Sequence, residues 1–388
     1  MDLKAIQTAL RERNFDAWLF YDHHHRDPIA YSVLGLPANL HVTRRWYYLI
    51  PAEGEPAKLN HRIEPGHLDS LPGTKAMYSS WEEQQANLKQ MLAPHKTIAM
   101  QYSPNNAVPQ VGLVDAGTIE LIRSFGHEIV SSGDLVSLFE AALSAEQIAS
   151  HFAAGEAIDR IMAASFQEIG NRVRNGACNE YDIQQWIANA FEREGLMFDD
   201  PAIVGVNANS GNPHYSPRRE SAKPIRKGDF VLLDMWGKQK KPGAVYYDIT
   251  WTGVVDAAPT AKQVEVFHAV TKARDAGFEK VRSAFEAKKK IAGWEVDKVT
   301  RESLVASGFG QYFTHRTGHS IAVEVHGNGA NIDNLETKDE RQIIPNTLFS
   351  IEPGVYLPEF GVRSEFDVLI RDGRAEITGK VQKELVRI

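Results

Sequence analysis

The spacing of apolar residues indicates an α/β arrangement in the first part of the chain. Leu3, Ile6 and Leu10 recur at helical spacing, so a helix is expected at the start. Short apolar runs typical of strands follow at residues 16–21, 46–50, 58–60 and 97–100. The turn-rich segment 51–56 joins two of these runs and indicates a hairpin. Helices and strands in this order predict one α/β domain over residues 1–143.

Three longer periodic segments indicate helices in the second part of the chain. The first begins at Ser144, which has capping-box spacing with Gln147, and its apolar face continues to about Gly176. Two more helices are expected at residues 181–194 and 260–285. Strand-like segments alternate with them, so a curved sheet packed by helices is expected. The helix at Ser144 marks the expected start of a second domain over residues 144–388.

Five potential metal ligands fall in strand-like or glycine-flanked segments of this second part: Asp234, Asp248, His319, Glu352 and Glu365. Asp234 ends one apolar run and Asp248 begins the next, with a hairpin connection expected at residues 237–243. A carboxylate at the end of a buried strand costs free energy unless a cation or hydrogen bonds compensate it. Carboxylates can bridge two divalent cations, and a single imidazole leaves room for water and substrate. The set therefore has the composition of a two-metal hydrolytic site.

Each of these residues, taken singly, also has a purely structural explanation. Asp234 suits a strand-end cap and Asp248 a turn position. Glu352 suits an acid before proline, and Glu365 suits a partner for Arg363. A lone histidine is more often a hydrogen-bonded core residue than a ligand. The metal-site interpretation is favoured because all five residues occur in order within such segments.

With these segments in this order, the chain resembles the pita-bread metallopeptidases, which include methionine aminopeptidase, aminopeptidase P, prolidase and the non-peptidase creatinase. The resemblance covers roughly the C-terminal two-thirds of the chain. It implies a fold of the α/β (α+β) class. The expected architecture is a C-terminal pita-bread domain, with a curved antiparallel sheet and helices, preceded by a smaller creatinase-like N-terminal α/β domain.

The resemblance also implies a role for each candidate ligand. Asp234 would bind one metal ion, Asp248 and Glu365 would bridge two, and His319 and Glu352 would complete the second. Creatinase lacks this ligand set, so creatinase activity is not expected.

Further residues are expected to act around these ligands. By the same resemblance, His214 and His326 lie on the substrate side, where they could donate hydrogen bonds to the substrate. Glu352 is the candidate to move a proton from the nucleophile to the leaving nitrogen. Arg363, two residues before Glu365, is expected to orient that ligand. His315 would share a face with the metal-binding histidine four residues later if their segment were helical.

The implied activity is that of a metal-dependent exopeptidase of the aminopeptidase P or prolidase type. It would hydrolyse Xaa-Pro bonds in peptides with proline at the second position, using a hydroxide activated by two divalent metal ions. Carboxylate-rich ligation with one imidazole favours Mn(II), while Co(II), Zn(II) and Fe(II) are chemically acceptable. One alternative is another reaction on the same scaffold, either hydrolysis of a small amide metabolite or dimethylsulfoniopropionate lyase chemistry. Another is a non-catalytic binding module, which would usually have lost some ligands.

Some positions depart from the family pattern. Asp234 and Asp248 are 14 positions apart, which is longer than the commonest arrangement, so an extended hairpin is expected. Dipeptide-specific prolidases often place an arginine shortly after the second histidine to hold the free carboxylate, and residues 327–331 contain none. The resemblance therefore does not imply strict dipeptide specificity.

Composition narrows the class of protein further. The chain is 43% hydrophobic and 24% charged, as in ordinary globular proteins, and its net charge of −7 provides no general attraction to nucleic acid or anionic lipid. Cys178 is the only cysteine, so an intrachain disulfide is impossible and a cytoplasmic location is favoured. The first residues lack a signal-peptide pattern, and no apolar run has transmembrane length, so no membrane association is expected. A homodimer, mediated by the N-terminal domain, is expected from two-domain relatives.

Overall fold

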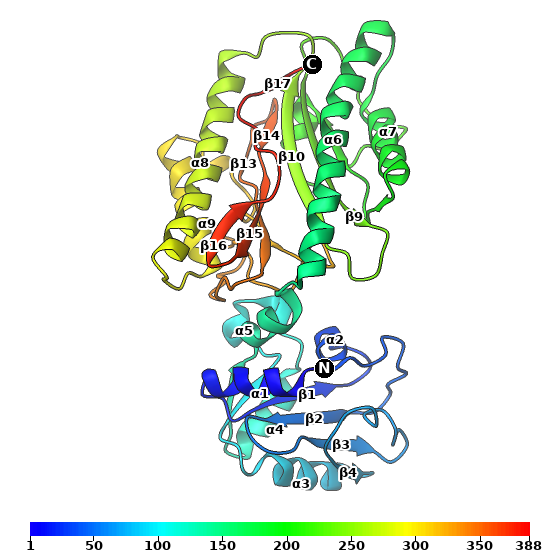
Figure 1. The fold of residues 1–388 in the computed structure, drawn as a ribbon, viewed down its shortest axis with the longest axis vertical. Helices are drawn as coiled ribbons and strands as arrows, with labels where there is room; N and C mark the ends of the chain where they lie inside the picture. Colours follow the sequence, from blue (N-terminus) through cyan, green and yellow to red (C-terminus); the bar gives the residue numbers. More distant parts are fainter. The chain divides into compact units, whose positions relative to one another are not determined.

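The computed structural model describes all 388 residues, which form two compact units, Met1–Glu140 and Ala141–Ile388 (Figure 1). This division falls a few residues before the expected boundary at residues 143 and 144. Each unit has its own sheet and its own buried apolar clusters.

The first unit is built around a six-stranded mixed sheet with the order β4-β3-β2-β1-β5-β6. Its strands are β1 Ala17–Asp22, β2 Trp46–Pro51, β3 Ala57–His61, β4 Thr74–Tyr78, β5 Thr97–Met100 and β6 Glu128–Ser131. Its helices are α1 Leu3–Glu12, α2 Pro28–Leu34, α3 Trp81–Leu92, α4 Ala116–Ser124 and α5 Gly133–Val136. Along β1, Trp18 and Phe20 pack in one apolar cluster and Leu19 and Tyr21 in another, so both sheet faces are covered. The predicted α/β character of this part, including the β2–β3 hairpin, is confirmed.

The second unit has four long helices: α6 Ala145–Asn175, α7 Glu180–Arg193, α8 Ala261–Glu286 and α9 Gly293–Ala306. Both predicted capping boxes are confirmed. The Ser144 hydroxyl accepts a hydrogen bond from the Gln147 backbone N–H while the Gln147 side chain accepts one from the Ser144 N–H, and Thr260 and Gln263 repeat the pattern. These local contacts explain why the starts of α6 and α8 could be located from the sequence.

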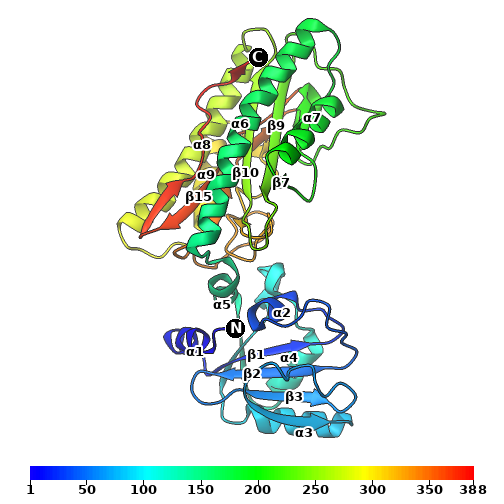
Figure 2. The same ribbon diagram turned by 45° about the vertical axis from the view of Figure 1, so that its right-hand side comes forward.

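The helices of the second unit enclose mostly antiparallel strands. One sheet has the order β17-β10-β9-β7, with β8 also paired to β9; its strands are β7 Leu196–Met197, β8 Ile203–Val206, β9 Phe230–Gln239, β10 Tyr247–Val254 and β17 Val386–Arg387. A second sheet contains β11 Ser320–Ile321, β12 Leu348–Ile351, β15 Phe366–Arg371 and β16 Arg374–Ile377, and a third pairs β13 Gly354–Tyr356 with β14 Gly361–Arg363. Helices α6 and α7 cover one side of these strands and α8 and α9 the other (Figures 1 and 2).

The hairpin that carries the first two predicted ligands is confirmed, since β9 and β10 pair antiparallel. Its predicted connection, residues 237–243, is wrong at the start, because β9 continues through Gln239 and pairs there with β7. Gly237 fits inside the strand because Phe191 packs against it, within 2.8 Å of where a Cβ would lie. The connection is instead residues 240–246, whose first four residues are exposed.

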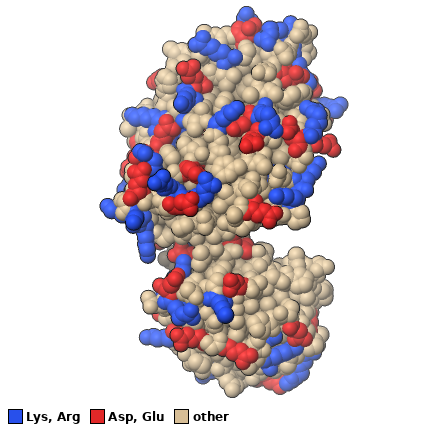
Figure 3. Space-filling model, in the orientation of Figure 1, with Lys and Arg blue, Asp and Glu red and all other residues tan.

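Charged side chains are dispersed over the surface. Lysine and arginine alternate with aspartate and glutamate on the face of each unit shown in Figure 3. None of the helices combines the length and the apolar character that crossing a membrane requires.

Candidate metal centre and active site

The β9–β10 pair places the first two candidate ligands on one sheet face. Asp234 on β9 lies directly opposite Thr250 on β10, and Asp248 lies two residues before Thr250. Since cross-strand partners and residues two apart share a face of a sheet, all three side chains point to the same side. Asp234 and Asp248 are both buried, so the sheet brings two carboxylates into the interior.

The third candidate ligand is held by a network that fixes its backbone. His319 donates its backbone N–H to the Ser350 hydroxyl at 3.0 Å, and its carbonyl accepts from the Ser350 N–H at 2.9 Å. Gly318, just before it, must be glycine, because a Cβ there would lie 1.9 Å from the Ser350 carbonyl oxygen. Thr317 is anchored by the buried Asp297, which accepts from its backbone N–H and its hydroxyl at 2.9 and 2.6 Å. The close β12 contact thus sets the position of the imidazole.

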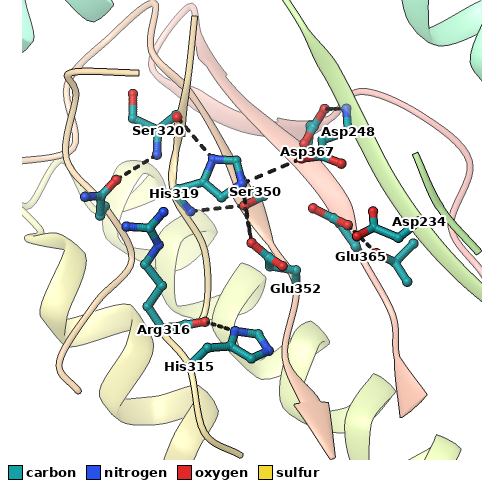
Figure 4. A network of polar contacts seen from close by, with 12 residues as sticks. Asp234, Asp248, His315, Arg316, His319, Ser320, Ser350, Glu352, Glu365 and Asp367 are labelled. Carbon is teal, nitrogen blue, oxygen red and sulfur yellow. Dashed lines mark hydrogen bonds and ion pairs between the residues drawn. The ribbon is translucent and has the colours of Figure 1, made fainter. Parts of the chain in front are cut away.

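The remaining two acids follow the ends of short strands. Glu352 comes directly after β12, and Glu365 lies between β14 and β15. The His319 Nε2 atom lies 3.6 Å from Asp248 Oδ2 and 3.4 Å from Glu352 Oε1, across the cluster seen in Figure 4. Asp248, His319 and Glu365 each offer a ligand atom within 4.8 Å of the others, so they could hold a metal ion.

The tautomer of the imidazole suits metal binding. His319 Nδ1 lies 3.2 Å from the Ser320 carbonyl oxygen, so in the neutral ring Nδ1 carries the proton and donates to that carbonyl. Its Nε2 lone pair then faces the acids. Burial lowers the pKa of His319 below its ordinary value, which favours the neutral ring.

The acids are strained electrostatically in the absence of a cation. Burial, reinforced by repulsion from Asp234, raises the pKa of Asp248 well above its ordinary value. Burial and repulsion from Asp248 do the same to the pKa of Glu365. One oxygen each of Asp234, Asp248 and Glu365 is buried without a hydrogen-bond partner. Unsatisfied buried groups cost roughly 1–3 kcal/mol each, and divalent cations would satisfy all three oxygens, so the donor set fits metal ions.

Arg363 is hydrogen-bonded to the acids on both sides of the candidate site, to one directly and to the other through a hydroxyl. One of its Nη atoms pairs with Asp234 Oδ2. Its Nε donates to the Thr250 hydroxyl at 3.0 Å, and that hydroxyl donates to Glu365 Oε2 at 2.6 Å. Arg363 therefore contacts Asp234 directly and reaches Glu365 through Thr250.

His315 belongs to a second hydrogen-bonded chain and not to a helical face, because its segment is not helical. Its Nδ1 lies 2.7 Å from the Arg316 carbonyl oxygen, so Nδ1–H donates there and Nε2 accepts from the Tyr356 hydroxyl at 2.7 Å. The Tyr356 oxygen in turn accepts from Arg363 at 2.9 Å. Burial, together with the Arg363 charge, lowers the pKa of His315 to about 3, so the ring stays neutral.

The two histidines expected on the substrate side line the same cavity as the acids. This cavity has a volume of about 270 Å³, and the predicted residues that line it are His214, Asp234, Asp248, His315, His319, His326, Glu352, Arg363 and Glu365. The His326 ring meets the His319 ring edge to face, with 4.4 Å between centroids. Desolvation, and then repulsion from His319 and Arg316, lowers the pKa of His326. His214 is exposed in a turn at the cavity wall. The structure thus brings all nine predicted side chains together.

Two supporting residues were missed in the sequence. Asp367 is fully buried and accepts the Asp248 backbone N–H at 2.9 Å, while burial and repulsion from Asp248 raise its pKa well above the ordinary value. Thr250 links Arg363 to Glu365 as described above. Both residues lie two positions after a predicted ligand, so the period-two alternation of a strand was the available signal.

A comparison with protein families matches metallopeptidase family M24 over residues 151–372. Since this covers more than half of the chain, the chain belongs to this family. It is 32% identical over 239 residues to the Xaa-Pro dipeptidase of Pyrococcus furiosus, a match that covers 60% of this chain and 61% of that protein. A Mycoplasma pneumoniae relative matches at 32% over 204 residues, which cover 50% of this chain and 52% of that protein. The chain therefore aligns with about half to three-fifths of these relatives' length.

Solved structures with the same fold cover nearly the whole chain. Dipeptidase PepE from Mycobacterium ulcerans matches with a TM-score of 0.68 at 22% identity, covering 100% of this chain and 96% of that one. The prolidase from Pyrococcus horikoshii OT3 matches with a TM-score of 0.62 at 23% identity, covering 99% of both chains. The family match over residues 151–372 confirms the predicted superfamily, and these structures confirm the predicted fold class.

Proposed function

We propose that this protein is a metal-dependent exopeptidase that hydrolyses Xaa-Pro bonds. The observation that carries the proposal is the convergence of three buried acids, the partly buried Glu352 and one imidazole on one cavity, with three carboxylate oxygens that lack any protein partner. Membership of family M24 and similarity to an Xaa-Pro dipeptidase over part of the chain support the substrate class.

Two divalent metal ions are proposed as the cofactor, with Mn(II) favoured by the carboxylate-rich donor set. Asp234 would serve one ion, His319 and Glu352 the other, and Asp248 and Glu365 both. When bound, the ions would lower the pKa of water and polarise the scissile carbonyl.

The chain's own groups would then position the substrate and move protons. Burial raises the pKa of Glu352, which suits a carboxylate that accepts a proton and passes it to the leaving nitrogen. His326 has a lowered pKa, so at neutral pH its uncharged ring can donate an N–H to the carbonyl oxygen of the substrate. His214, which lines the same cavity, offers a second donor.

A cytoplasmic location and a homodimeric state are also proposed. The single cysteine, Cys178, is buried, which is compatible with a reducing compartment. Fractionation of the native cells and the mass of the purified full-length protein by light scattering would check these two points.

The test is a metal-reconstituted activity screen. Protein stripped by chelator is loaded with Mn(II), Co(II), Zn(II) or Fe(II) and offered Xaa-Pro dipeptides, longer Xaa-Pro peptides, matched Xaa-Ala peptides, small amides and dimethylsulfoniopropionate. Release of the N-terminal residue from Xaa-Pro substrates, and not from the Xaa-Ala controls, is expected. Turnover of the sulfonium compound or of the small amides alone would refute the peptidase proposal.

A further inference from the structure

Arg316 is held firmly by its backbone but leaves its guanidinium free. Its N–H donates to Glu336 Oε1 at 3.1 Å, and its carbonyl accepts from His315 Nδ1 at 2.7 Å. The side chain is partly buried and lines the cavity. None of its guanidinium nitrogens forms a hydrogen bond or an ion pair with any of the 388 residues, and no aromatic ring lies against the guanidinium. A positioned cation thus faces the cavity without a protein partner.

The other arginine that lines the cavity already has protein partners. Arg363 is committed to Asp234, Thr250 and Tyr356, and the cavity lining contains no lysine. Arg316 is therefore the one uncommitted arginine or lysine at the place where substrate would bind.

The free Arg316 guanidinium lies near the candidate metal ligand His319. Figure 4 shows the Arg316 side chain extending along its segment toward His319.

The volume of the cavity limits which part of a substrate could contact the Arg316 guanidinium. At about 270 Å³, the cavity lies just below the usual range of roughly 300–1,000 Å³ for small-molecule sites. In an Xaa-Pro dipeptide the terminal carboxylate follows the scissile carbonyl by one residue, a distance of about 3.8 Å between successive Cα atoms. A carboxylate so close to the metal ligands falls within the same cavity, and a guanidinium can bind it through two parallel hydrogen bonds.

We propose that Arg316 binds the C-terminal carboxylate of the substrate and makes the site selective for Xaa-Pro dipeptides over longer peptides. The inference rests on the proposed function and adds the substrate class to it. The same carboxylate chemistry is also present on an acidic side chain of the first substrate residue, so the test must separate these two sources.

The experiment compares steady-state kinetics of the metal-loaded full-length protein with Arg316→Gln and Arg316→Lys. Arg226→Gln is the matched control, since Arg226 is exposed and does not line the cavity. The substrates are Ala-Pro, its C-terminal amide, Ala-Pro-Ala and Glu-Pro amide. Loss of a hydrogen-bonded charge pair should lower kcat/KM for Ala-Pro by about 10- to 100-fold in Arg316→Gln. Wild type and Arg316→Gln should cleave Ala-Pro amide with equal kcat/KM. For Ala-Pro, Arg316→Lys should have an intermediate kcat/KM, and Arg226→Gln should match wild type.

Each of four other outcomes would overturn either this inference or the proposed function. An equal loss on Ala-Pro and its amide would overturn the inference, because the arginine would then support the site generally. A selective loss on Glu-Pro amide would overturn it in favour of side-chain recognition. A wild-type protein that cleaves Ala-Pro-Ala better than Ala-Pro would also overturn it while leaving the peptidase proposal intact. A wild-type protein that cleaves none of these peptides would overturn the proposed function itself.

Discussion

Replacing Thr250 by valine removes one hydroxyl from the centre of the site and keeps the shape of the side chain. That hydroxyl is completely buried, donates to Glu365 Oε2 at 2.6 Å and accepts from Arg363 Nε at 3.0 Å. Both partners are buried ionisable groups, so valine would leave each of them without one hydrogen bond. The substitution therefore separates Glu365 from the arginine that supports it.

The size of the effect follows from these two bonds. A hydrogen bond to a charged group contributes roughly 1.5–3 kcal/mol, so the loss of two at Thr250→Val should lower the free energy of unfolding by about 3 kcal/mol or more. Valine is a good strand residue, so β10 itself should persist. Groups that orient metal ligands typically change metal affinity by about 10- to 100-fold, and a loss in this range is expected.

The assay is metal titration by calorimetry with chelator competition, together with denaturant unfolding of the metal-free protein. Thr250→Ser keeps the hydroxyl and should retain most of the metal affinity. Thr252→Val is the matched control, because Thr252 lies two residues along the same strand, is equally buried, and has a hydroxyl without a partner. It should be neutral or stabilising. Equal metal affinity in Thr250→Val and Thr252→Val would refute the reasoning.

Three further predictions concern the metal site and one histidine outside it. Asp248→Ala should abolish metal-dependent turnover and reduce the bound metal found by elemental analysis; full activity would contradict the ligand assignment. His326→Ala should keep the metal content of wild type and lower turnover by about 100-fold, as expected for loss of a transition-state donor; loss of the metal ions would place this residue among the ligands instead. His151 bonds to the Tyr246 carbonyl and the Thr378 hydroxyl, and burial lowers its pKa from 6.5 to about 4. The folded state therefore binds fewer protons than the unfolded state between these pH values, so stability is full above pH 6.5 and falls as the pH drops toward 4, by about 3 kcal/mol from this residue. Urea unfolding at several pH values should show a shallower decline in His151→Gln, and identical slopes would exclude the assignment.

The parts of the fold that the sequence predicted are those set by neighbouring residues. The capping boxes at Ser144 and Thr260 involve residues three positions apart, and the helices begin where they predict. The extent of β9 was missed because Gly237 suggests a turn, whereas pairing with β7 and packing against Phe191 keep it in the strand. Such tertiary contacts override local propensity.

In the candidate site, too, some residues could be recognised from the sequence and others only from the folded chain. Asp234, Asp248 and the other proposed ligands were recognised from their order along the chain, and the structure places them in one cavity. Thr250 and Asp367 were missed because their supporting roles depend on hydrogen-bond partners 115 and 119 positions away in the sequence. Likewise, only the folded chain shows that Arg363 is committed to partners while Arg316 is free.

The exposed tip of the β9–β10 connection has a practical consequence for protein engineering. The register of the two strands is fixed by paired residues from Phe230 opposite Val254 to Gly237 opposite Tyr247, so the tip does not set the position of either aspartate. Lys241 and Pro242 are exposed there. Chain insertions are best tolerated at exposed loop tips. A short epitope or fluorophore-labelling peptide inserted between these two residues would therefore report on the folded protein without altering the candidate site.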